Sequence, residues 1–417
     1  MTSIPGGQFT FSAANKPINV VVTPNGQNMP PPVPGDFNLE VVTGNANSLA
    51  PGYQGLALLS NGGHSVDLST GDYGVFVTGT GPDTIRAGSG NDTIVGGWGP
   101  DTIIGGSGHD LIYGGFSDDT IIAGSGPTTI YGGHGNDLIT GGAGPDVLYG
   151  GFGNDTITAG SGPTTIQGGF GNAVITGGTG PDVLYGGFGN DSITAGSGPT
   201  TIQGGFGSDL ITGGSGPDVI NAGLGKDTIQ GGSGPETIYG GNAGDLIKGG
   251  SGQETVFGGN GNDTIQAGSG PATIHGGYGN DQIYGGSGTQ VLYGDEGNDT
   301  VYGGSGHDTI YAGQGNDVIH AGTGGGLIVA GPGNNTIYGG SGADHIVDAG
   351  PNGHDTVYGF DPHSGHDLIS FVGENAHTIH KVVATAEQDH GNTTLNLPDG
   401  STITLAGVHH IDASFFH

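Results

Sequence analysis

The chain repeats a nine-residue pattern over most of its length. From residue 79 to residue 348 the sequence divides into thirty consecutive units of nine residues without an insertion, and GSGNDTIVG (88–96) and GFGNDTITA (151–159) are representative. A short fixed period of this kind is typical of a solenoid, in which each unit stacks only on its neighbours. The repeat therefore restricts the chain to a stacked-coil architecture.

Each unit carries one position suited to a buried strand. The seventh residue is always Ile, Leu or Val, as in Ile85, Leu148 and Val256, and its neighbours are mostly residues that tolerate solvent. This alternation predicts a strand of about three residues with one buried face. The other positions carry Gly, Asn and Asp, which suit tight corners. One inward side chain per strand agrees with an apolar content of only 32% and with 99 glycines in 417 residues.

Successive units alternate in kind. The second residue is large in one set, as in Trp98, Phe152 and Leu224, and small in the other, as in Ser107 and Ala143. The coil is therefore predicted to be 18 residues long, with two strands and two corners. We call the corners with the large residue row A and those with the small residue row B.

The charge balance favours cations as partners. The chain has 38 Asp and Glu against 5 Lys and Arg, a formal net charge of −33, and no cysteine. Such a charge repels nucleic acid and anionic membranes, so we expect neither as a partner. No stretch is long and apolar enough to span a bilayer, and the N-terminus does not resemble a cleaved signal peptide, so we expect no membrane insertion.

The unit pattern closely resembles a known calcium-binding repeat. Gly150-Gly151-Phe152-Gly153-Asn154-Asp155-Thr156-Ile157 is similar to the hemolysin-type (RTX) nonapeptide G-G-x-G-x-D-x-(Ile/Leu/Val)-x. The resemblance implies an all-β fold, a right-handed parallel β-roll or β-solenoid with two strands per 18-residue coil, here with irregular β caps. It also implies multiple structural Ca²⁺ ions, each shared by aspartates and main-chain carbonyls of corners one coil apart. Glycine-rich corners with Asp supply the oxygen ligands that Ca²⁺ prefers.

The aspartates of the two rows are the candidate Ca²⁺ ligands. Row A offers Asp83, Asp101, Asp119, Asp137, Asp155, Asp191, Asp209, Asp227, Asp245, Asp263, Asp281, Asp299 and Asp317, with Ala173 as an interruption and Asn335 at the end. Row B offers Asp92, Asp110, Asp146, Asp182, Asp218, Asp308 and Asp344, and its other corners carry Thr128, Thr164, Thr200, Glu236, Glu254, Ala272, Gln290 and Gly326. We therefore expect near-complete occupancy in row A and fewer or weaker sites in row B, where Pro before the acidic position stiffens many corners.

The ends of the chain differ from the array. We predict an extended N-terminal arm with one strand and a Pro-rich spacer (1–35), a degenerate β N-cap (36–78), the calcium-binding β-roll (79–348) and a C-terminal β cap (349–417). The final residues, 411–417, resemble the uncleaved hydrophobic tail of RTX proteins exported by type I secretion. By resemblance, the chain is secreted unfolded through that machinery and folds on Ca²⁺ outside the cell or at its surface.

The sequence contains no catalytic motif that we recognise. It lacks H-E-x-x-H and G-x-S-x-G, and Gly225-Lys226 is followed by Asp227 rather than the Ser or Thr of a phosphate-binding loop. We therefore predict that the chain is not an enzyme. A second metal held by His354, His363 and His366 remains an alternative to exposed loop histidines.

Large outward residues point to a structural or interaction role. The aromatic residues of row A recur every 18 residues and are predicted to stack as a ladder: Trp98, Phe116, Phe152, Phe170, Phe188 and Phe206. One interpretation is that the ladder drives a homo-oligomer or fibre in a surface layer or biofilm matrix. Another is that the rings only stiffen the corners. A third is a monomeric adhesive or ice-binding solenoid, based on the aligned Thr140, Thr158, Thr176, Thr194 and Thr212.

Overall fold

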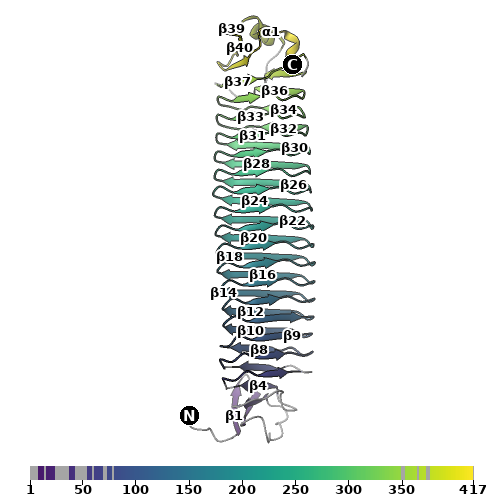
Figure 1. The fold of residues 1–417 in the computed structure, drawn as a ribbon, viewed down its shortest axis with the longest axis vertical. Coiled ribbons are helices and arrows are strands. Elements are labelled where there is room, and N and C mark those ends of the chain that lie inside the picture. The colour runs from purple at the N-terminus through teal and green to yellow at the C-terminus, as the bar shows by residue number, and fades with distance from the viewer. Residues whose placement is uncertain are drawn as a thin grey trace. The chain divides into compact units, whose positions relative to one another are not determined.

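The computed structural model describes residues 8–13, 16–23, 37–42, 54–58, 61–68, 73–77, 79–348, 353–363, 366–371 and 376–416. It divides into two compact units, Met1–Phe206 and Gly207–His417, and each is treated by itself below. Within each unit, strands of successive coils stack one above the next (Figure 1).

The first unit consists of two sheets of stacked strands. The long-strand sheet contains β1 (Gln8–Ala13), β2 (Lys16–Thr23), β3 (Phe37–Val42), β4 (Gly55–Leu58), β6 (Gly74–Val77), β8 (Thr93–Gly97), β10 (Asp110–Phe116), β12 (Thr128–His134), β14 (Asp146–Phe152), β16 (Thr164–Phe170), β18 (Asp182–Phe188) and β20 (Thr200–Phe206). The short-strand sheet contains β5 (Ser65–Asp67), β7 (Thr84–Arg86), β9 (Thr102–Gly106), β11 (Thr120–Gly124), β13 (Leu138–Thr140), β15 (Thr156–Thr158), β17 (Val174–Thr176) and β19 (Ser192–Thr194).

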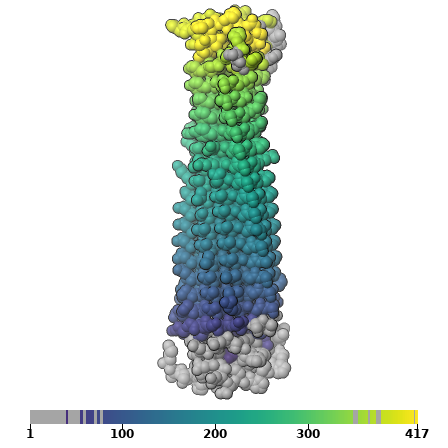
Figure 2. All heavy atoms as spheres, turned by 45° about the vertical axis from the view of Figure 1, so that its right-hand side comes forward, coloured from purple at the N-terminus to yellow at the C-terminus, as the bar shows by residue number. Residues whose placement is uncertain are grey.

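The repeat strands pair in parallel with a shift of one coil. Ile157 of β15 pairs with Ile175 of β17, and Phe152 of β14 pairs with Phe170 of β16. The paired residues lie 18 positions apart, so equivalent side chains of successive coils form straight columns on the surface (Figure 2). The predicted parallel β-solenoid with two strands per 18-residue coil is confirmed.

The second unit continues the same two kinds of strand. Its long-strand sheet contains β22 (Asp218–Leu224), β24 (Glu236–Asn242), β26 (Glu254–Asn260), β28 (Ala272–Tyr278), β30 (Gln290–Glu296), β32 (Asp308–Tyr311), β34 (Gly326–Val329), β36 (Asp344–Asp348) and β38 (Leu368–Phe371). Its short-strand sheet contains β21 (Leu210–Thr212), β23 (Thr228–Gln230), β25 (Leu246–Lys248), β27 (Thr264–Gln266), β29 (Gln282–Tyr284), β31 (Thr300–Tyr302), β33 (Val318–His320), β35 (Thr336–Tyr338) and β37 (His354–Tyr358).

A mixed cap follows β37. β41 (Thr402–Ala406) pairs in parallel with β37, and β40 (Asn392–Asn396) and β39 (Glu387–Asp389) add antiparallel to it. The helix α1 (Ala376–Ala384) and the 3₁₀ turn η1 (Ala413–Phe415) complete the cap. Ile411, Phe415 and Phe416 of the tail are buried.

The core of each unit is a double column of aliphatic side chains. The seventh residue of the repeat is buried in coil after coil, for example at Ile94, Ile157 and Leu184 in the first unit and at Ile229 and Val301 in the second. Two such residues per coil leave little volume to fill. The chain therefore needs few apolar residues.

Three details differ from the expectations. Most repeat strands of one sheet span seven residues rather than about three, because each continues through a Gly-Gly pair in which Gly151, with φ 116°, adopts a conformation that favours glycine. The N-terminal region contains the antiparallel pair β1–β2 instead of one strand. Helix α1 was also not expected, although Ile379 and Val382 have helical spacing. The Pro-rich spacer near residue 30 lies outside the described residues.

Candidate metal sites

Row A places a carboxylate immediately before almost every short strand. In the first unit, the main-chain N–H of Asp137 donates to Asp155 Oδ1 at 2.9 Å; in the second, Asp263 N–H donates to Asp281 Oδ1 at 2.8 Å. All thirteen candidate aspartates of row A are buried. One carboxylate oxygen is thus fixed by the main chain of the preceding coil.

The second carboxylate oxygen of these residues has no such bond. Oδ2 is buried and has no hydrogen-bond partner in Asp83, Asp101, Asp119, Asp137, Asp155, Asp227, Asp245, Asp263, Asp281, Asp299 and Asp317. A glycine leaves space beside it, since a Cβ at Gly96 would lie 2.6 Å from Asp101 Oδ2 and 2.5 Å from the carbonyl oxygen of Gly114. A carboxylate oxygen and a carbonyl oxygen from the next coil therefore converge at this point.

The second unit repeats the arrangement. A Cβ at Gly276 would lie 2.5 Å from Asp281 Oδ2 and 2.7 Å from Gly294 O. Among the described residues, no three His, Asp or Glu side chains form a metal-binding group. A cation in row A would therefore combine carboxylate oxygens with main-chain carbonyls, an all-oxygen donor set that suits Ca²⁺ and does not suit Zn²⁺.

Comparison with known proteins agrees with this donor set. The family model described as "RTX calcium-binding nonapeptide repeat (4 copies)" matches repeatedly from residue 75 to residue 347, in overlapping segments that begin with 75–103 and 95–130 and end with 320–347. The chain belongs to the RTX calcium-binding nonapeptide repeat family. The matched segments cover the predicted array, which confirms the resemblance inferred from the sequence.

Other comparisons add little. No curated protein matches the chain. Among solved structures, the extracellular lipase LipA from Serratia marcescens aligns with 20% identity and a TM-score of 0.21, over 44% of this chain and 40% of the lipase chain. The chain thus spans less than half the length of that lipase.

Burial changes the acidity of the RTX aspartates. Desolvation raises the pKa of Asp119 to about 8; main-chain hydrogen bonding to Asp101 N–H opposes the rise, and the nearby carboxylates, Asp137 first, add to it. Burial likewise raises the pKa of Asp137 and of Asp245 to about 7. The charged column is therefore unfavourable without cations, and protons compete with metal for it.

Row A contains an interruption, an end and an extension. At Ala173 the side chain is a methyl group, which approaches Gly168 where other coils place Oδ2. Asn335 Oδ1 accepts the N–H of Asp317, and its own N–H donates to Asp355 Oδ1 at 2.8 Å. Asp355 thus continues the row beyond the nonapeptide array. Sequence reasoning did not assign it, although the Gly353-His354-Asp355 remnant of the repeat marks it.

Row B contains two kinds of aspartate. Asp146 and Asp182 are satisfied by main-chain donors: Thr128 N–H and Gly142 N–H bind the two oxygens of Asp146 at 3.0 and 2.6 Å, and Asp182 has the equivalent pair. By contrast, Oδ2 of Asp110 and Asp308 is buried without a hydrogen-bond partner.

The remaining predicted residues of row B are all buried. The main-chain N–H of Asp92 donates to Asp110 Oδ1 at 3.0 Å. Oδ2 of Asp218 accepts the N–H of Gly214, and Oδ2 of Asp344 accepts the N–H of Gly340. Asp344 N–H donates in turn to Asp367, a further buried carboxylate that sequence reasoning did not assign and that the remnant Gly365-His366-Asp367 marks.

The threonine corners of row B carry no charge for a cation to balance. The hydroxyls of Thr128, Thr164 and Thr200 donate to the carbonyl oxygens of Gly126, Gly162 and Gly198, in that order, each at 3.2 Å. A hydroxyl here caps the corner from within. The prediction of fewer or weaker sites in row B stays a prediction, with a physical basis in these bonds.

The aromatic residues predicted to interact form a continuous stack in the first unit. Trp98 and Phe116 have ring centroids 4.4 Å apart, Phe116 stacks on His134 and His134 on Phe152, and the Phe170–Phe188 and Phe188–Phe206 pairs are 5.0 and 4.7 Å apart. Phe152 is 52% exposed. Because each ring covers the faces of its neighbours, the stack presents mainly ring edges to solvent.

Sequence reasoning missed further aromatic columns at the eighth position of the repeat. The first unit stacks Tyr113, Tyr131 and Tyr149; the second unit stacks Tyr239, Phe257, His275, Tyr293 and Tyr311 on the long-strand sheet and Tyr284, Tyr302, His320, Tyr338 and Tyr358 on the short-strand sheet. The spacing of these residues, 18 positions in each column except for the 20 positions between Tyr338 and Tyr358, was the available signal.

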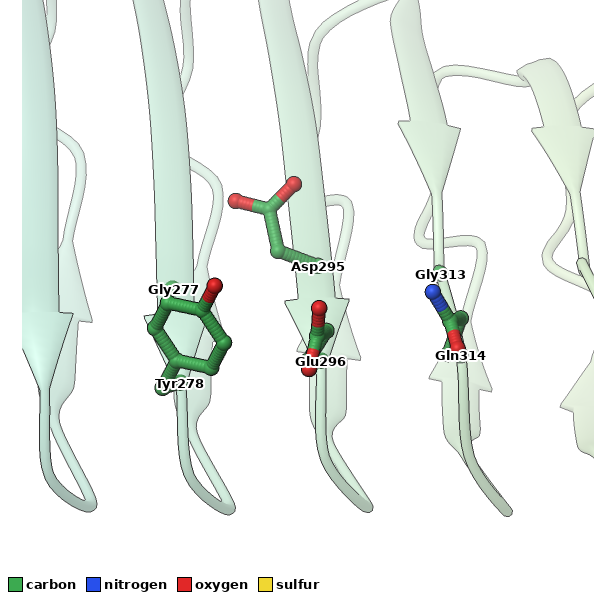
Figure 3. Close-up of a pocket in the computed structure, with 6 residues that line it drawn as sticks. All are labelled: Gly277, Tyr278, Asp295, Glu296, Gly313 and Gln314. Atoms are coloured by element: carbon green, nitrogen blue, oxygen red, sulfur yellow. The ribbon is translucent and has the colours of Figure 1, made fainter.

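Two surface hollows include aromatic side chains in their lining. One, of about 460 Å³, includes Tyr278, Asp295, Glu296 and Gln314 from three neighbouring coils (Figure 3). The other, of about 280 Å³ in the first unit, lies between Phe188 and Phe206 on one side and the neighbouring column of Gln167, Tyr185 and Gln203 on the other. Both are open surface features.

The C-terminal histidines do not converge in the part of the chain that the structure describes. His354 Nδ1 lies 2.9 Å from Thr402 Oγ1, and the ring of His363 packs edge-on against Phe415. Helix α1 is too short to cross a bilayer, and no other described helix is long and apolar enough to do so.

Proposed function

We propose that the chain is a secreted, non-catalytic structural protein that folds on Ca²⁺ outside the cell and self-associates through a charge-free part of its surface. The observation that carries the first part is the column of buried carboxylates in row A, each with one oxygen bonded to the main chain and, in most coils, a second oxygen without a hydrogen-bond partner.

Calcium supplies the charge that this column needs. The chain has 38 acidic and only 5 basic residues, and the ion pairs of the described residues all involve histidine. Burying unpaired carboxylates is costly, and a core of two aliphatic side chains per coil offsets little of that cost. Ca²⁺ binding and folding are therefore one event.

Circular dichroism tests this coupling. In EGTA the far-ultraviolet spectrum is expected to be that of an unfolded chain, and millimolar Ca²⁺ is expected to produce a β spectrum, whereas Mg²⁺ at the same concentration is expected to be much less effective. An unchanged spectrum on adding Ca²⁺ would refute the proposal.

Family membership supports secretion. RTX proteins are generally exported by type I secretion, and Ca²⁺ is scarce in the cytosol, so the chain stays unfolded until it leaves the cell. In the folded state the tail is packed in the cap, where Phe416 stacks on Phe371 with centroids 5.7 Å apart. Removing residues 411–417 is expected to abolish export, while a substitution in an exposed corner leaves export intact.

Self-association rests on the surface of residues 128–206. This stretch contains no Lys, Arg or Glu, and each of its Asp residues is buried. Its exposed large apolar residues are Tyr131, Leu138, Phe152, Phe170, Val174, Tyr185, Phe188 and Phe206. Exposed like charges on two copies repel one another, so a surface without charged side chains favours their approach. We therefore infer that the partner is a second copy of the chain.

Sedimentation velocity in Ca²⁺ tests the association. The variant with Phe152, Phe170, Phe188 and Phe206 all replaced by Ser is expected to sediment as a smaller species than the wild type. The matched control replaces Thr140, Thr158, Thr176 and Thr194 of the opposite sheet by Ser. A monomeric wild type, or a Phe variant that sediments like the wild type, contradicts this part of the proposal and leaves calcium-dependent folding untouched.

The second candidate, ice binding, rests on the threonine column. Thr140, Thr158, Thr176 and Thr194 pair in register on β13, β15, β17 and β19. The neighbouring column consists of Leu138, Thr156, Val174 and Ser192, which differ in size and polarity. One regular column of Thr favours this function less than the charge-free aromatic surface favours association. Thermal hysteresis of the wild type and of the threonine control variant distinguishes the two functions. Ice binding predicts thermal hysteresis in the wild type and a loss of it in the variant, whereas self-association alone predicts none in either.

A further inference from the structure

Nine of the chain's 14 tyrosines stack on another tyrosine in the part of the chain that the structure describes. In the first unit Tyr131 lies between Tyr113 and Tyr149, with ring centroids 5.0 and 4.7 Å away. The second unit contains three such pairs, with centroids 4.9, 4.9 and 5.1 Å apart: Tyr284–Tyr302, Tyr293–Tyr311 and Tyr338–Tyr358. Phenol rings of neighbouring coils are thus held face to face at four places.

The strands fix these pairs, and solvent reaches them. Tyr131 pairs in register with Tyr113 and with Tyr149 along parallel strands, and the planes of the rings differ by 8° and 2°. Tyr131 is 36% exposed and Tyr338 is 40% exposed. A small oxidant or an enzyme at the surface can therefore reach rings that already lie beside a second phenol.

Other tyrosines of the chain have no tyrosine in the adjacent coils. Tyr185 belongs to the same column as Tyr131 but pairs in register with Gln167 and Gln203. Tyr239 and Tyr278 likewise pair in register only with other residue types. All three are exposed, so they match the stacked tyrosines in access and differ from them in the neighbouring side chain.

We propose that the stacked tyrosine pairs are sites of oxidative cross-linking, at which hydrogen peroxide and a peroxidase join neighbouring coils through dityrosine. Each of the two phenols loses one hydrogen atom from its hydroxyl group to the oxidant. The two radicals form a carbon–carbon bond between ring carbons next to the hydroxyl groups, and the hydrogens on those carbons move to the oxygens. Hydrogen peroxide takes up the two hydrogen atoms, its O–O bond breaks, and two water molecules form.

The stack favours coupling within one chain. The second ring is in place before the first is oxidised, so the two groups react without a bimolecular encounter. The chain contains no cysteine, so a disulfide bond cannot join its coils. A bond between Tyr131 and Tyr149 closes a loop of the chain and restricts the unfolded state, as a disulfide bond does. Cross-linked coils are thereby less dependent on bound cations.

The test oxidises the purified full-length chain in Ca²⁺ with a haem peroxidase and hydrogen peroxide, and measures dityrosine by fluorescence. The wild type is expected to form dityrosine while it still runs as a single chain on a denaturing gel. The yield per chain is expected to be independent of chain concentration. The purified chain is used, so the result depends neither on export nor on self-association.

Two variants separate the stacked tyrosines from the others. Y131F/Y302F/Y311F/Y338F leaves no stacked tyrosine pair among the described residues and is expected to lose the dityrosine signal. The control Y185F/Y239F/Y278F is expected to retain the wild-type yield. Phenylalanine is accepted in these columns, since Tyr239 stacks on Phe257 with centroids 5.1 Å apart. Circular dichroism in Ca²⁺ verifies that both variants are folded.

Three results would overturn the proposal: an undiminished yield in the fourfold variant, an equal loss in the control, or wild-type dityrosine that joins separate chains. Peptide mass spectrometry of the oxidised wild type provides a measurement that needs no variant. Cross-linked peptides are expected to join Tyr131 to Tyr113 or Tyr149. Cross-links formed mainly by Tyr185 would contradict the assignment even if the fourfold variant did not fold.

Discussion

The main-chain N–H of Asp137 donates to Oδ1 of Asp155, 2.9 Å away and one coil later in the chain. The same bond joins Asp119 to Asp137 and Asp101 to Asp119. Each aspartate thus links two coils through one oxygen and presents the other to the candidate metal site. Cation binding in one coil is in this way coupled to the backbone of its neighbour.

A rise in pH is expected to destabilise the metal-free folded state and to favour the Ca²⁺-bound folded state. Burial raises the pKa of Asp119 from 3.8 to about 8 and that of Asp101 to about 7. In the absence of metal, a raised folded-state pKa makes stability greatest below pH 3.8 and lowers it as the pH rises towards 8. Acid is therefore expected to increase β structure in EGTA.

Ca²⁺ binding requires the carboxylates to be ionised, so protons compete with it. The Ca²⁺ concentration at the midpoint of folding is expected to be higher at pH 5.5 than at pH 8. Circular dichroism titrations at the two pH values check this. Equal midpoints would argue against the buried carboxylates as ligands.

Asp119 is expected to be among the row A residues most sensitive to substitution. Asp119 is buried with the carboxylates of Asp137, Asp101 and Asp118 nearby. Since losing an outer partner of a metal ligand costs about 10–100-fold in affinity, losing the ligand itself in D119N should cost about 100-fold or more at that site. Calorimetric titration measures the change.

The control for this prediction is D118N. Asp118 is exposed, and its Oδ1 accepts the N–H of Asn136 at 2.7 Å, a bond that an asparagine oxygen can retain. Calcium binding by D118N is expected to remain close to that of the wild type. A similar loss in both variants would point to a general effect of net charge.

Ala173 interrupts row A, and A173D is expected to add a calcium site. The flanking Asp155 and Asp191 already lie one coil away on each side, and the N–H of Ala173 already donates to Asp191 Oδ1 at 2.7 Å. The variant should bind more Ca²⁺ than the wild type and unfold at a higher temperature in Ca²⁺. A173S, which adds a polar group without a charge, should do neither.

The aliphatic column is expected to contribute strongly to stability even though it is thin. Ile157 is fully buried, and Ile157→Ala should destabilise the Ca²⁺-bound state by about 2–5 kcal/mol. Thr156→Ala at the exposed neighbouring position should change the stability by less than about 0.5 kcal/mol. Thermal unfolding at fixed Ca²⁺ compares the two. Similar effects would mean that cations, not packing, determine the stability of this coil.

Much of the architecture could be predicted because the same pattern, with one apolar position per strand, occurs in thirty consecutive units. Ile94, Ile157 and Val301 are inward in the structure because a strand with one buried face accepts only an apolar residue there. The seven-residue length of the long strands could not be predicted in the same way. It depends on the Gly150-Gly151 pair remaining extended beside its neighbours in adjacent coils, which is a property of the stacked strands.

The sequence could also not separate the candidate ligands of row B. Asp146 and Asp110 occupy the same position of the repeat, yet Asp146 has two main-chain donors while Asp110 Oδ2 has none. The difference depends on which N–H groups the neighbouring coil directs at the carboxylate. Glutamate at this position has a longer reach: a Cβ at Gly231 would lie 2.5 Å from Glu236 Oε2, whereas a Cβ at the equivalent Gly141 would lie 3.3 Å from Asp146 Oδ2.

The nine-residue period by itself determined that this chain forms parallel coils with buried aliphatic columns and rows of acidic corners, because each unit can satisfy its backbone and its single apolar side chain only by stacking on its neighbours. The tertiary structure decided which acidic oxygens keep a main-chain partner and which do not. That depends on hydrogen bonds between residues 18 positions apart, which form only when one coil lies on the next.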